Sequence, residues 1–137
     1  MEPKTFTIHH LVKSEDLNHH GTLYAGRSAE WFVEAGFVSA ASLTQPKNIL
    51  CLKIHGLTFS RPVPPGTIVR FDSKVIMAGR TSLVSSVKMT TANGDEVVKG
   101  FITFIYVDDS GKPTPHGLEI TPVSPEDQAL MEEAKKL

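Results

Sequence analysis

The sequence predicts an α+β domain in which one long central helix is wrapped by a curved antiparallel sheet of about five strands. Three observations support this fold class. An early segment, from about Ala25 to about Leu43, is apolar on nearly every face, which is typical of a helix covered on several sides. The segments after it alternate apolar and polar residues with the period of two that strands require. Short turns separate these segments, and short turns favour antiparallel neighbours.

The first half of the chain contributes a strand, the helix and a second strand. Thr5–Leu11 is rich in β-branched and aromatic residues and is predicted as a strand, followed by a polar loop over residues 13–20. The helix must end before Gln45-Pro46, because proline disfavours helical backbone in the residue before it. Asn48–Ser60 is predicted as one long strand that bends at Gly56.

Three further strands are predicted over Thr67–Met77, Thr81–Thr91 and Glu96–Val107. Proline or glycine marks each turn before them, and Asn93-Gly94 is the strongest hairpin signal. With lengths of roughly 11–13 residues, these strands exceed the usual strand and are long enough to curve around a helix.

One domain is expected over residues 1–137, with a core over about residues 5–108 and a C-terminal extension over about residues 113–137. Pro113–Pro122 is proline-rich and is predicted to be extended. Ser124 is a good cap for a last helix over Glu126–Lys136, since its hydroxyl can accept a first-turn N–H and proline suits the first helical position. That helix has a thin apolar stripe and is expected on the surface.

The composition limits the classes of partner. The net charge of −1 and the absence of a basic patch argue against nucleic acid. The single cysteine, Cys51, excludes an intrachain disulfide and supplies no metal-binding pattern, so no metal is expected. The sequence shows neither a signal peptide nor an apolar run that could span a membrane, and a cytoplasmic protein is expected.

Two stretches carry residues suited to chemistry. The first is Asn18–Gly26 followed by the acidic helix segment Glu30–Gly36, and the second is His55–Gly66 followed by Ala78–Ser82. They resemble the Asn-x-x-Gly-x-[aliphatic]-[aromatic]-Gly-Gly turn, the Arg-Pro-Val-x-x-Gly turn and the Gly-x-[Thr/Ser]-Ser hairpin of the hotdog-fold acyl-CoA thioesterase superfamily. The similarity spans about residues 5–108. It implies a single hotdog domain. It also implies an enzyme that hydrolyses acyl-CoA to a free acid and CoA without a cofactor. It also implies a homodimer, or an assembly of dimers, with sites between subunits.

Thioester hydrolysis requires donors for an oxyanion and a carboxylate that activates water or attacks. The turn before the helix supplies backbone N–H groups, with Gly26 as the predicted oxyanion donor. Many relatives keep the acid at the position of Val33, which cannot act as a base. Glu34 stands one residue later, as in the fluoroacetyl-CoA-type branch, and is the predicted catalytic acid, with burial expected to raise its pKa. Glu30 is a second candidate.

Each of these roles has a structural alternative. Glu30 and Glu34 are also explained as the solvated edge of the helix, with Arg27 paired to Glu30. Asn18 either orients the attacking water or bonds the thioester carbonyl, or else it bonds its own backbone within the turn. Ala25 replaces a glycine of the family turn, a mild change if only its backbone acts.

The remaining candidates bind substrate. Positive side chains at turns suit the CoA phosphates, with Arg80 favoured over Arg61 and Lys88, although each is also explained as a solubility charge. The resemblance adds Gly21, Tyr24, Gly79, Thr81 and Ser82 to the predicted substrate and CoA contacts.

The histidines carry weaker signals. His19 and His20 do not fit the Asp-x-Asn-x-x-His pattern of the hydratase branch, because Asp16-Leu-Asn18-His-His20 is one residue short. His9 and His10 are interpreted as strand-face residues, and His55 as structural or as part of an acyl pocket.

A rival function is a non-catalytic acyl-CoA-binding hotdog module, such as a sensor or regulator. Val33 at the usual acid position favours this alternative. The absence of an appended DNA-binding helix weakens its regulator version.

Overall fold

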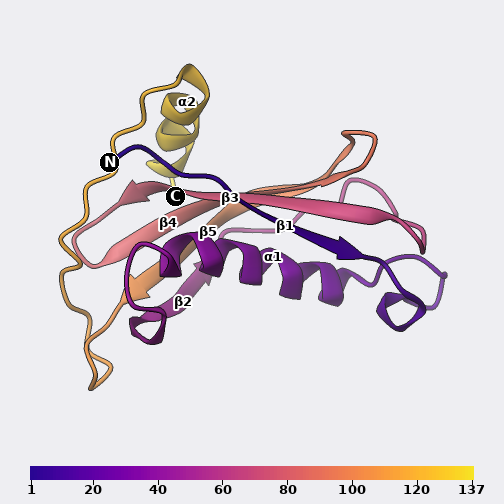
Figure 1. Ribbon diagram of the computed structural model, residues 1–137, viewed down its shortest axis with the longest axis horizontal. Coiled ribbons are helices and arrows are strands. Elements are labelled where there is room, and N and C mark those ends of the chain that lie inside the picture. The colour runs from indigo at the N-terminus through magenta and orange to yellow at the C-terminus, as the bar shows by residue number, and fades with distance from the viewer.

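The computed structural model describes all 137 residues and places one long helix across a five-stranded antiparallel sheet (Figure 1). The strands are β1 (Phe6–Leu11), β2 (Ile49–Ile54), β3 (Ile68–Ala78), β4 (Ser82–Thr91) and β5 (Glu96–Tyr106). Their order across the open sheet is β1-β3-β4-β5-β2, so β1 and β2 form its two edges. The predicted fold class is therefore confirmed.

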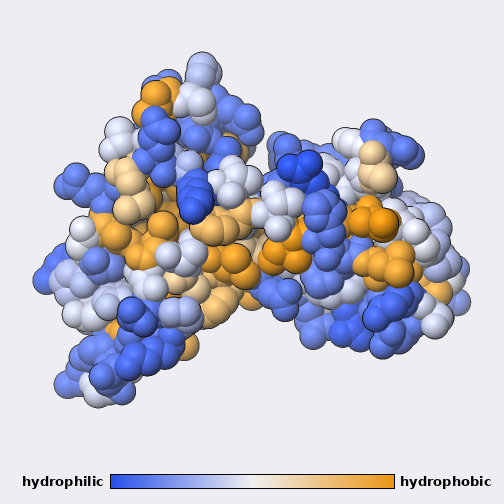
Figure 2. All heavy atoms as spheres, in the orientation of Figure 1, coloured by the Kyte–Doolittle hydropathy of each residue, from blue (hydrophilic) through white to orange (hydrophobic).

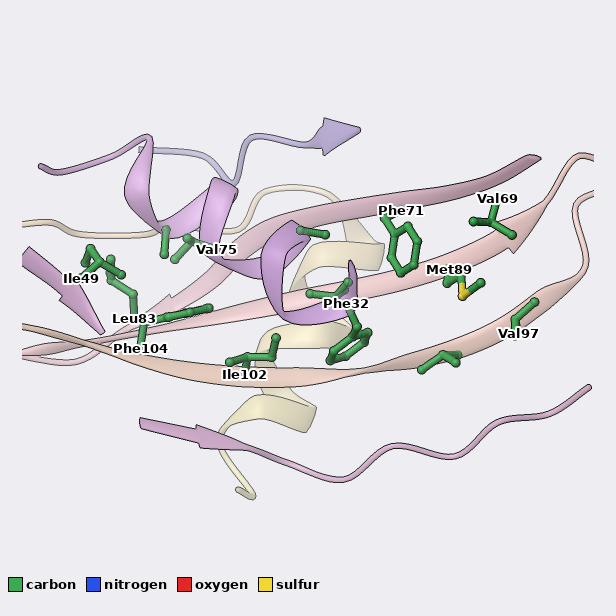
Figure 3. Packing of buried hydrophobic residues seen from close by; sticks show 14 of the residues in the cluster. Phe32, Ile49, Val69, Phe71, Val75, Leu83, Met89, Val97, Ile102 and Phe104 are labelled. Atoms are coloured by element: carbon green, nitrogen blue, oxygen red, sulfur yellow. The ribbon is translucent and has the colours of Figure 1, made fainter. Parts of the chain in front are cut away.

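The helix α1 (Ala25–Ala41) packs on one face of the sheet, mainly against β3 and β4. Phe32 points from α1 onto the strands and lies near Ile102 (Figure 3). At Gly36 the approach is closest, because a Cβ there would lie 2.8 Å from the Ile102 Cδ1 atom and 3.2 Å from Val87 Cγ2. Glycine at this position lets the helix backbone reach the sheet.

Buried serine hydroxyls also hold the middle of α1 on the sheet by hydrogen bonds to its backbone. Ser73 donates to the carbonyl of Ala35 at 2.6 Å, and Ser85 donates to the carbonyl of Gly36 at 3.1 Å. Ser39 also donates to the Gly36 carbonyl, at 2.8 Å. These bonds satisfy polar groups that would otherwise be costly in a core and fix the register of the helix on the sheet.

The helix is covered on one side rather than on several, contrary to expectation. Its buried residues, among them Phe32, Ala35 and Ser39, form a single face, whereas Val33 and Phe37 are half-buried on a flank. Because the sheet is open and lies on one side of α1, no strand covers the side of the helix that faces away from the sheet. Apolar surface gathers across the middle of the face on which α1 lies (Figure 2).

The predicted strand Asn48–Ser60 is too long. β2 ends at Ile54, and Gly56 has a φ of +85°, which turns the chain out of regular strand geometry. Two bonds still hold this segment beside β5, from the His55 N–H to the Phe101 carbonyl and from the Ser60 N–H to the Val97 carbonyl.

The C-terminal helix α2 (Pro125–Ala134) lies on the opposite, outer face of the sheet, where Ala134 packs with Ile76 and Val84. Ser124 caps it as expected, accepting from the Asp127 N–H at 3.1 Å. Neither helix has both the length and the apolar character needed to cross a membrane.

Candidate active site

The first of the two sequence stretches and the His55–Gly66 part of the second meet at one end of the sheet. The Leu23 N–H donates to the Val63 carbonyl at 2.8 Å, which joins the turn before α1 to the turn before β3. Between them lies a cavity of about 340 Å³, whose wall includes Asn18, Ala25, Phe59 and Arg61. This volume falls within the range of small-molecule sites.

Asn18 organises the turn that forms one wall of this cavity. Its Oδ1 atom accepts from the His20 N–H at 2.9 Å and the Thr22 N–H at 3.1 Å. Its Nδ2 atom donates to the Thr22 hydroxyl at 3.1 Å. Gly21 adopts a φ of +76° within the turn. The side chain therefore bonds its own turn, as one alternative anticipated, and its amide retains one hydrogen that no bond uses.

The start of α1 offers unused hydrogen-bond donors. Tyr24 is the N-cap but accepts nothing through its side chain, and its carbonyl accepts from Arg27 and Ser28. The N–H groups of Ala25 and Gly26 have no hydrogen-bond partner. Together with the helix dipole, two free N–H groups at a helix start favour negative charge on a bound group.

The Tyr24 ring occupies the space that a side chain at residue 26 would enter. A Cβ at Gly26 would overlap the Tyr24 ring, which covers the first turn of α1 from the outside. Because the Tyr24 side chain is exposed, its ring can move, and the contact is softer than the one at Gly36.

Arg27 and Glu30 form a charged cluster with the loop before the turn. The Arg27 guanidinium lies 3.2 Å from an oxygen of Asp16, which is 5% exposed, and 3.2 Å from a Glu30 oxygen. Asp16 also accepts from the Lys13 N–H at 2.9 Å. The predicted Arg27–Glu30 pair is present, and Glu30 lies on the solvated edge of the helix.

Glu34 does not line the cavity beside Asn18. Its side chain is 59% exposed and lies on the flank of α1 that faces β1, with its Oε1 atom 3.7 Å from His10 Nε2. The burial expected for Glu34 is absent in the single chain, because the neighbouring apolar side chains turn towards the sheet. Val33 lies on the opposite flank and packs against the core.

The candidate CoA contacts fall into two groups at opposite ends of the sheet. Arg61 lies at the Asn18 end and pairs with Asp95 at 3.2 Å. Gly79, Arg80, Thr81 and Ser82 form the β3–β4 turn at the other end, where the Gly79 N–H donates to the Ser82 carbonyl at 2.9 Å. The length of β3 separates the groups by about 35 Å within one chain.

Arg80 and Lys88 differ in their surroundings. Arg80 is exposed and has no carboxylate within ion-pair distance. Lys88 lies between the buried residues Val87 and Met89, so its side chain points to the outer face, away from α1. Lys88 is therefore remote from the helix start.

Two histidines have partners that sequence spacing did not show. His10 stacks on Trp31 with ring centroids 4.3 Å apart and 4° between the planes. His55 lies beyond the end of β2, where its Nε2 atom is 2.6 Å from the Thr103 hydroxyl. Burial and the nearby Lys53 ammonium lower the pKa of His55 below its usual 6.5. Both pairs join residues far apart in the chain, and no local pattern reports such contacts.

Comparison with known proteins provides independent information. A family model described as the thioesterase superfamily matches residues 20–98. A Bacillus subtilis protein, named as an uncharacterized acyl-CoA thioester hydrolase, is 26% identical over 105 residues. The match covers 73% of this chain and 60% of that protein, so this chain covers less than two thirds of its relative.

Solved structures share the fold closely. A hexameric acyl-CoA thioesterase, solved in its apo form, has a TM-score of 0.87 at 25% identity over 96% of this chain and 86% of its own. An acyl-CoA hydrolase from Staphylococcus aureus, in complex with butyryl coenzyme A, coenzyme A and coenzyme A disulfide, has a TM-score of 0.83 at 21% identity. That similarity covers 96% of this chain and 80% of the Staphylococcus aureus chain.

Proposed function

Because the chain belongs to the thioesterase superfamily of hotdog-fold proteins, we propose that it is an acyl-CoA thioesterase, which hydrolyses the thioester to a free acid and CoA. The observation that carries this proposal is the uncapped start of α1. The N–H groups of Ala25 and Gly26 are free, and Ala25 lines the cavity between the Asn18 turn and the His55–Gly66 segment. A thioester carbonyl placed there gains two donors for the oxygen that becomes negative during attack.

In the proposed reaction, water attacks the carbonyl carbon, the C–S bond breaks, and the thiolate leaves with a proton. The remaining amide hydrogen of Asn18 is suited to holding the carbonyl or the water at the cavity wall. Glu34 is the proposed carboxylate that assists the attack, with Glu30 second because Arg27 already holds it. The glycine turn at Gly21 and the Tyr24 ring border the approach to the helix start.

We further propose that two chains assemble through β2. This edge strand exposes Leu50, Leu52 and Ile54, and an unpaired apolar edge favours pairing with another strand. A two-fold axis at β2 places the Gly79–Ser82 turn of one chain at the Asn18 end of its partner. Arg80 of one chain and Arg61 of the other then suit the CoA phosphates. The hexameric thioesterase of the same fold is consistent with assembly.

The proposed substrate agrees with the cytoplasmic location expected from the sequence. Phe59 in the cavity wall can pack against either an aliphatic or an aromatic acyl group, so both kinds of substrate belong in the test.

The test is thiol release from a panel of short, long and aromatic acyl-CoAs, followed with a chromogenic thiol reagent. We expect at least one substrate to be hydrolysed and Glu34→Gln to lower kcat/KM by about 10²-fold. Glu132→Gln is the matched control, because Glu132 lies on α2 and pairs only with Lys135. That control should retain the wild-type rate.

The rival function is a non-catalytic acyl-CoA-binding module. Val33 at the usual acid position and the exposure of Glu34 favour it. The same panel separates the two functions when binding is measured in parallel by calorimetry. Acyl-CoA binding without thiol release from any substrate would establish the module and reject the enzyme.

A further inference from the structure

The side chain of His10 is held in a fixed orientation near the end of β1. One face of its ring stacks on Trp31, with a centroid distance of 4.3 Å, and Phe71 meets it edge-on at 6.0 Å. Trp31 and Phe71 also contact each other edge-on at 6.4 Å. Packing of this kind locks the two side-chain torsions of the imidazole, which is how functional side chains are preorganised.

The two ring nitrogens of His10 have different surroundings. Nε2 is inaccessible to solvent and has no hydrogen-bond partner, and the nearest carboxylate oxygen is Glu34 Oε1 at 3.7 Å. Nδ1 is not enclosed in this way and also has no hydrogen-bond partner. The exposed Glu34 side chain needs to move by less than about 1 Å to accept a hydrogen bond from Nε2–H. That bond fixes the tautomer in which Nδ1 carries the free lone pair.

Glu34 is the acid near His10 that lacks a cationic partner from lysine or arginine. Glu15 pairs with Lys13 at 3.3 Å. Asp16 and Glu30 both pair with Arg27 at 3.2 Å. The charge of Glu34 is therefore available to act on the imidazole alone.

The accessible side of this pair faces a cavity. A space of about 430 Å³ is bordered by His10, Trp31, Arg27 and Asp16. Arg27 directly follows Gly26, so this cavity and the one beside Asn18 lie on two sides of the first turn of α1. For His10 to act on a group bound at the free N–H donors, that group has to extend around the first turn of α1 into the cavity that His10 borders.

We propose that His10 is the general base of the reaction and that Glu34 is its positioning residue, an inference that rests on the proposed thioester hydrolysis. Nδ1 of His10 takes a proton from water as the water oxygen bonds to the thioester carbon. The C–S bond breaks, and the imidazolium returns the proton to the leaving thiolate. Glu34 holds the ring through Nε2–H and stabilises the positive imidazolium, as a carboxylate does for a catalytic histidine. This role explains why Glu34 lies one residue after Val33 and faces β1, where His10 lies.

The test compares single and double variants on the best substrate of the panel. We expect His10→Gln to lower kcat by about 10³-fold or more, with KM changed by less than about threefold. Glu34→Gln should lower kcat by a smaller factor. The double variant should be no slower than His10→Gln, because Glu34 acts through His10 and effects on one unit do not multiply. His9→Gln, a substitution of the exposed histidine next along β1, is the matched control and should retain wild-type kcat.

A purely structural role is separated by chemical rescue. Added imidazole should restore part of the kcat of His10→Ala, whereas a lost packing contact would not respond. If His10→Ala does not fold, as judged by circular dichroism, the coupling between Glu34→Gln and His10→Gln still decides. Wild-type kcat in His10→Gln, or multiplicative losses in the double variant, would overturn the proposal while leaving the thioesterase intact. A wild type that releases no thiol from any substrate rejects the proposed function itself.

Discussion

The two edge strands of the sheet, β1 and β2, differ in how their side chains are covered within the chain. At the β1 edge, side chains of the strand meet side chains of α1, as His10 does with Trp31 and Glu34. At the β2 edge, Leu50, Leu52 and Ile54 are between 41% and 60% exposed and meet nothing in the same chain. Val33 and Phe37, on the flank of α1 that faces this edge, are only half-buried.

This difference separates two tasks. The β1 edge is complete within one chain and holds the polar groups to which we assign a role in chemistry. The β2 edge is apolar and incomplete, which suits assembly with a second chain. Substitutions at β1 should therefore change rates without changing mass, and substitutions at β2 should change mass first.

The largest expected effect is loss of the proposed β2 assembly in Leu52→Lys. A two-fold interface contains each residue twice, and removal of a central apolar contact costs about 2 kcal/mol per copy. Two copies together raise the dissociation constant of the assembly by roughly 10³-fold. Sedimentation equilibrium over a range of protein concentrations measures this constant directly.

Leu11→Lys is the matched control for this experiment. Leu11 is the last residue of β1 and is 50% exposed, so it presents a similar apolar side chain at the other edge. Its substitution should leave the mass unchanged. If Leu11→Lys dissociates the protein and Leu52→Lys does not, the assignment of assembly to β2 is wrong.

Effects of intermediate size are expected from substitutions of two glycines in α1, the helix that packs between the two edges. Gly36→Ala places a methyl group 2.8 Å from Ile102 Cδ1 in the core, and overpacking of this kind costs about 1–3 kcal/mol. Gly26→Ala meets the exposed Tyr24 ring, so the free energy of unfolding should stay within about 0.5 kcal/mol of wild type. Its kcat/KM should still fall by about tenfold, because the displaced ring disturbs the helix start. Urea unfolding measures the free energy of unfolding, and thiol release measures kcat/KM. Equal losses of stability in Gly36→Ala and Gly26→Ala would contradict this prediction.

The fold was predictable from sequence because it depends on local signals. Apolar residues of period two located β3, β4 and β5 to within about two residues, and Gln45-Pro46 marked the region in which α1 ends. The error in β2 arose because a single glycine, Gly56, leaves strand geometry while the apolar pattern continues through Leu57 and Phe59. Pattern alone does not report the backbone angle of a glycine.

The candidate site was only partly predictable, for a different reason. The Asn18 turn and the helix start were found because their residues are contiguous. The contact of His10 with Trp31 and Glu34 links a strand to a helix more than twenty residues later, and nothing in the spacing of these residues records it. The exposure of Glu34 also depends on which flank of α1 the sheet covers, a property of the assembled fold.

The smallest expected effect is a pH dependence at the β2 edge. Burial, with help from Lys53, lowers the pKa of His55 in the folded chain below 6.5, whereas the unfolded chain keeps the ordinary value. Below pH 6.5 the unfolded state therefore binds the proton more readily, and stability falls as the pH drops through the folded-state pKa. Above pH 6.5 both states are neutral at this residue, and the contribution is constant.

Urea midpoints at about pH 8 and about pH 5 measure this dependence, with His55→Gln subtracting the other titrating groups. The variant should lose less stability on acidification than the wild type. Thr103→Val removes the hydroxyl 2.6 Å from Nε2 without removing the imidazole, so it should retain the wild-type slope while lowering stability at both pH values. An unchanged slope in His55→Gln would show that the pKa of His55 does not differ between the folded and the unfolded chain.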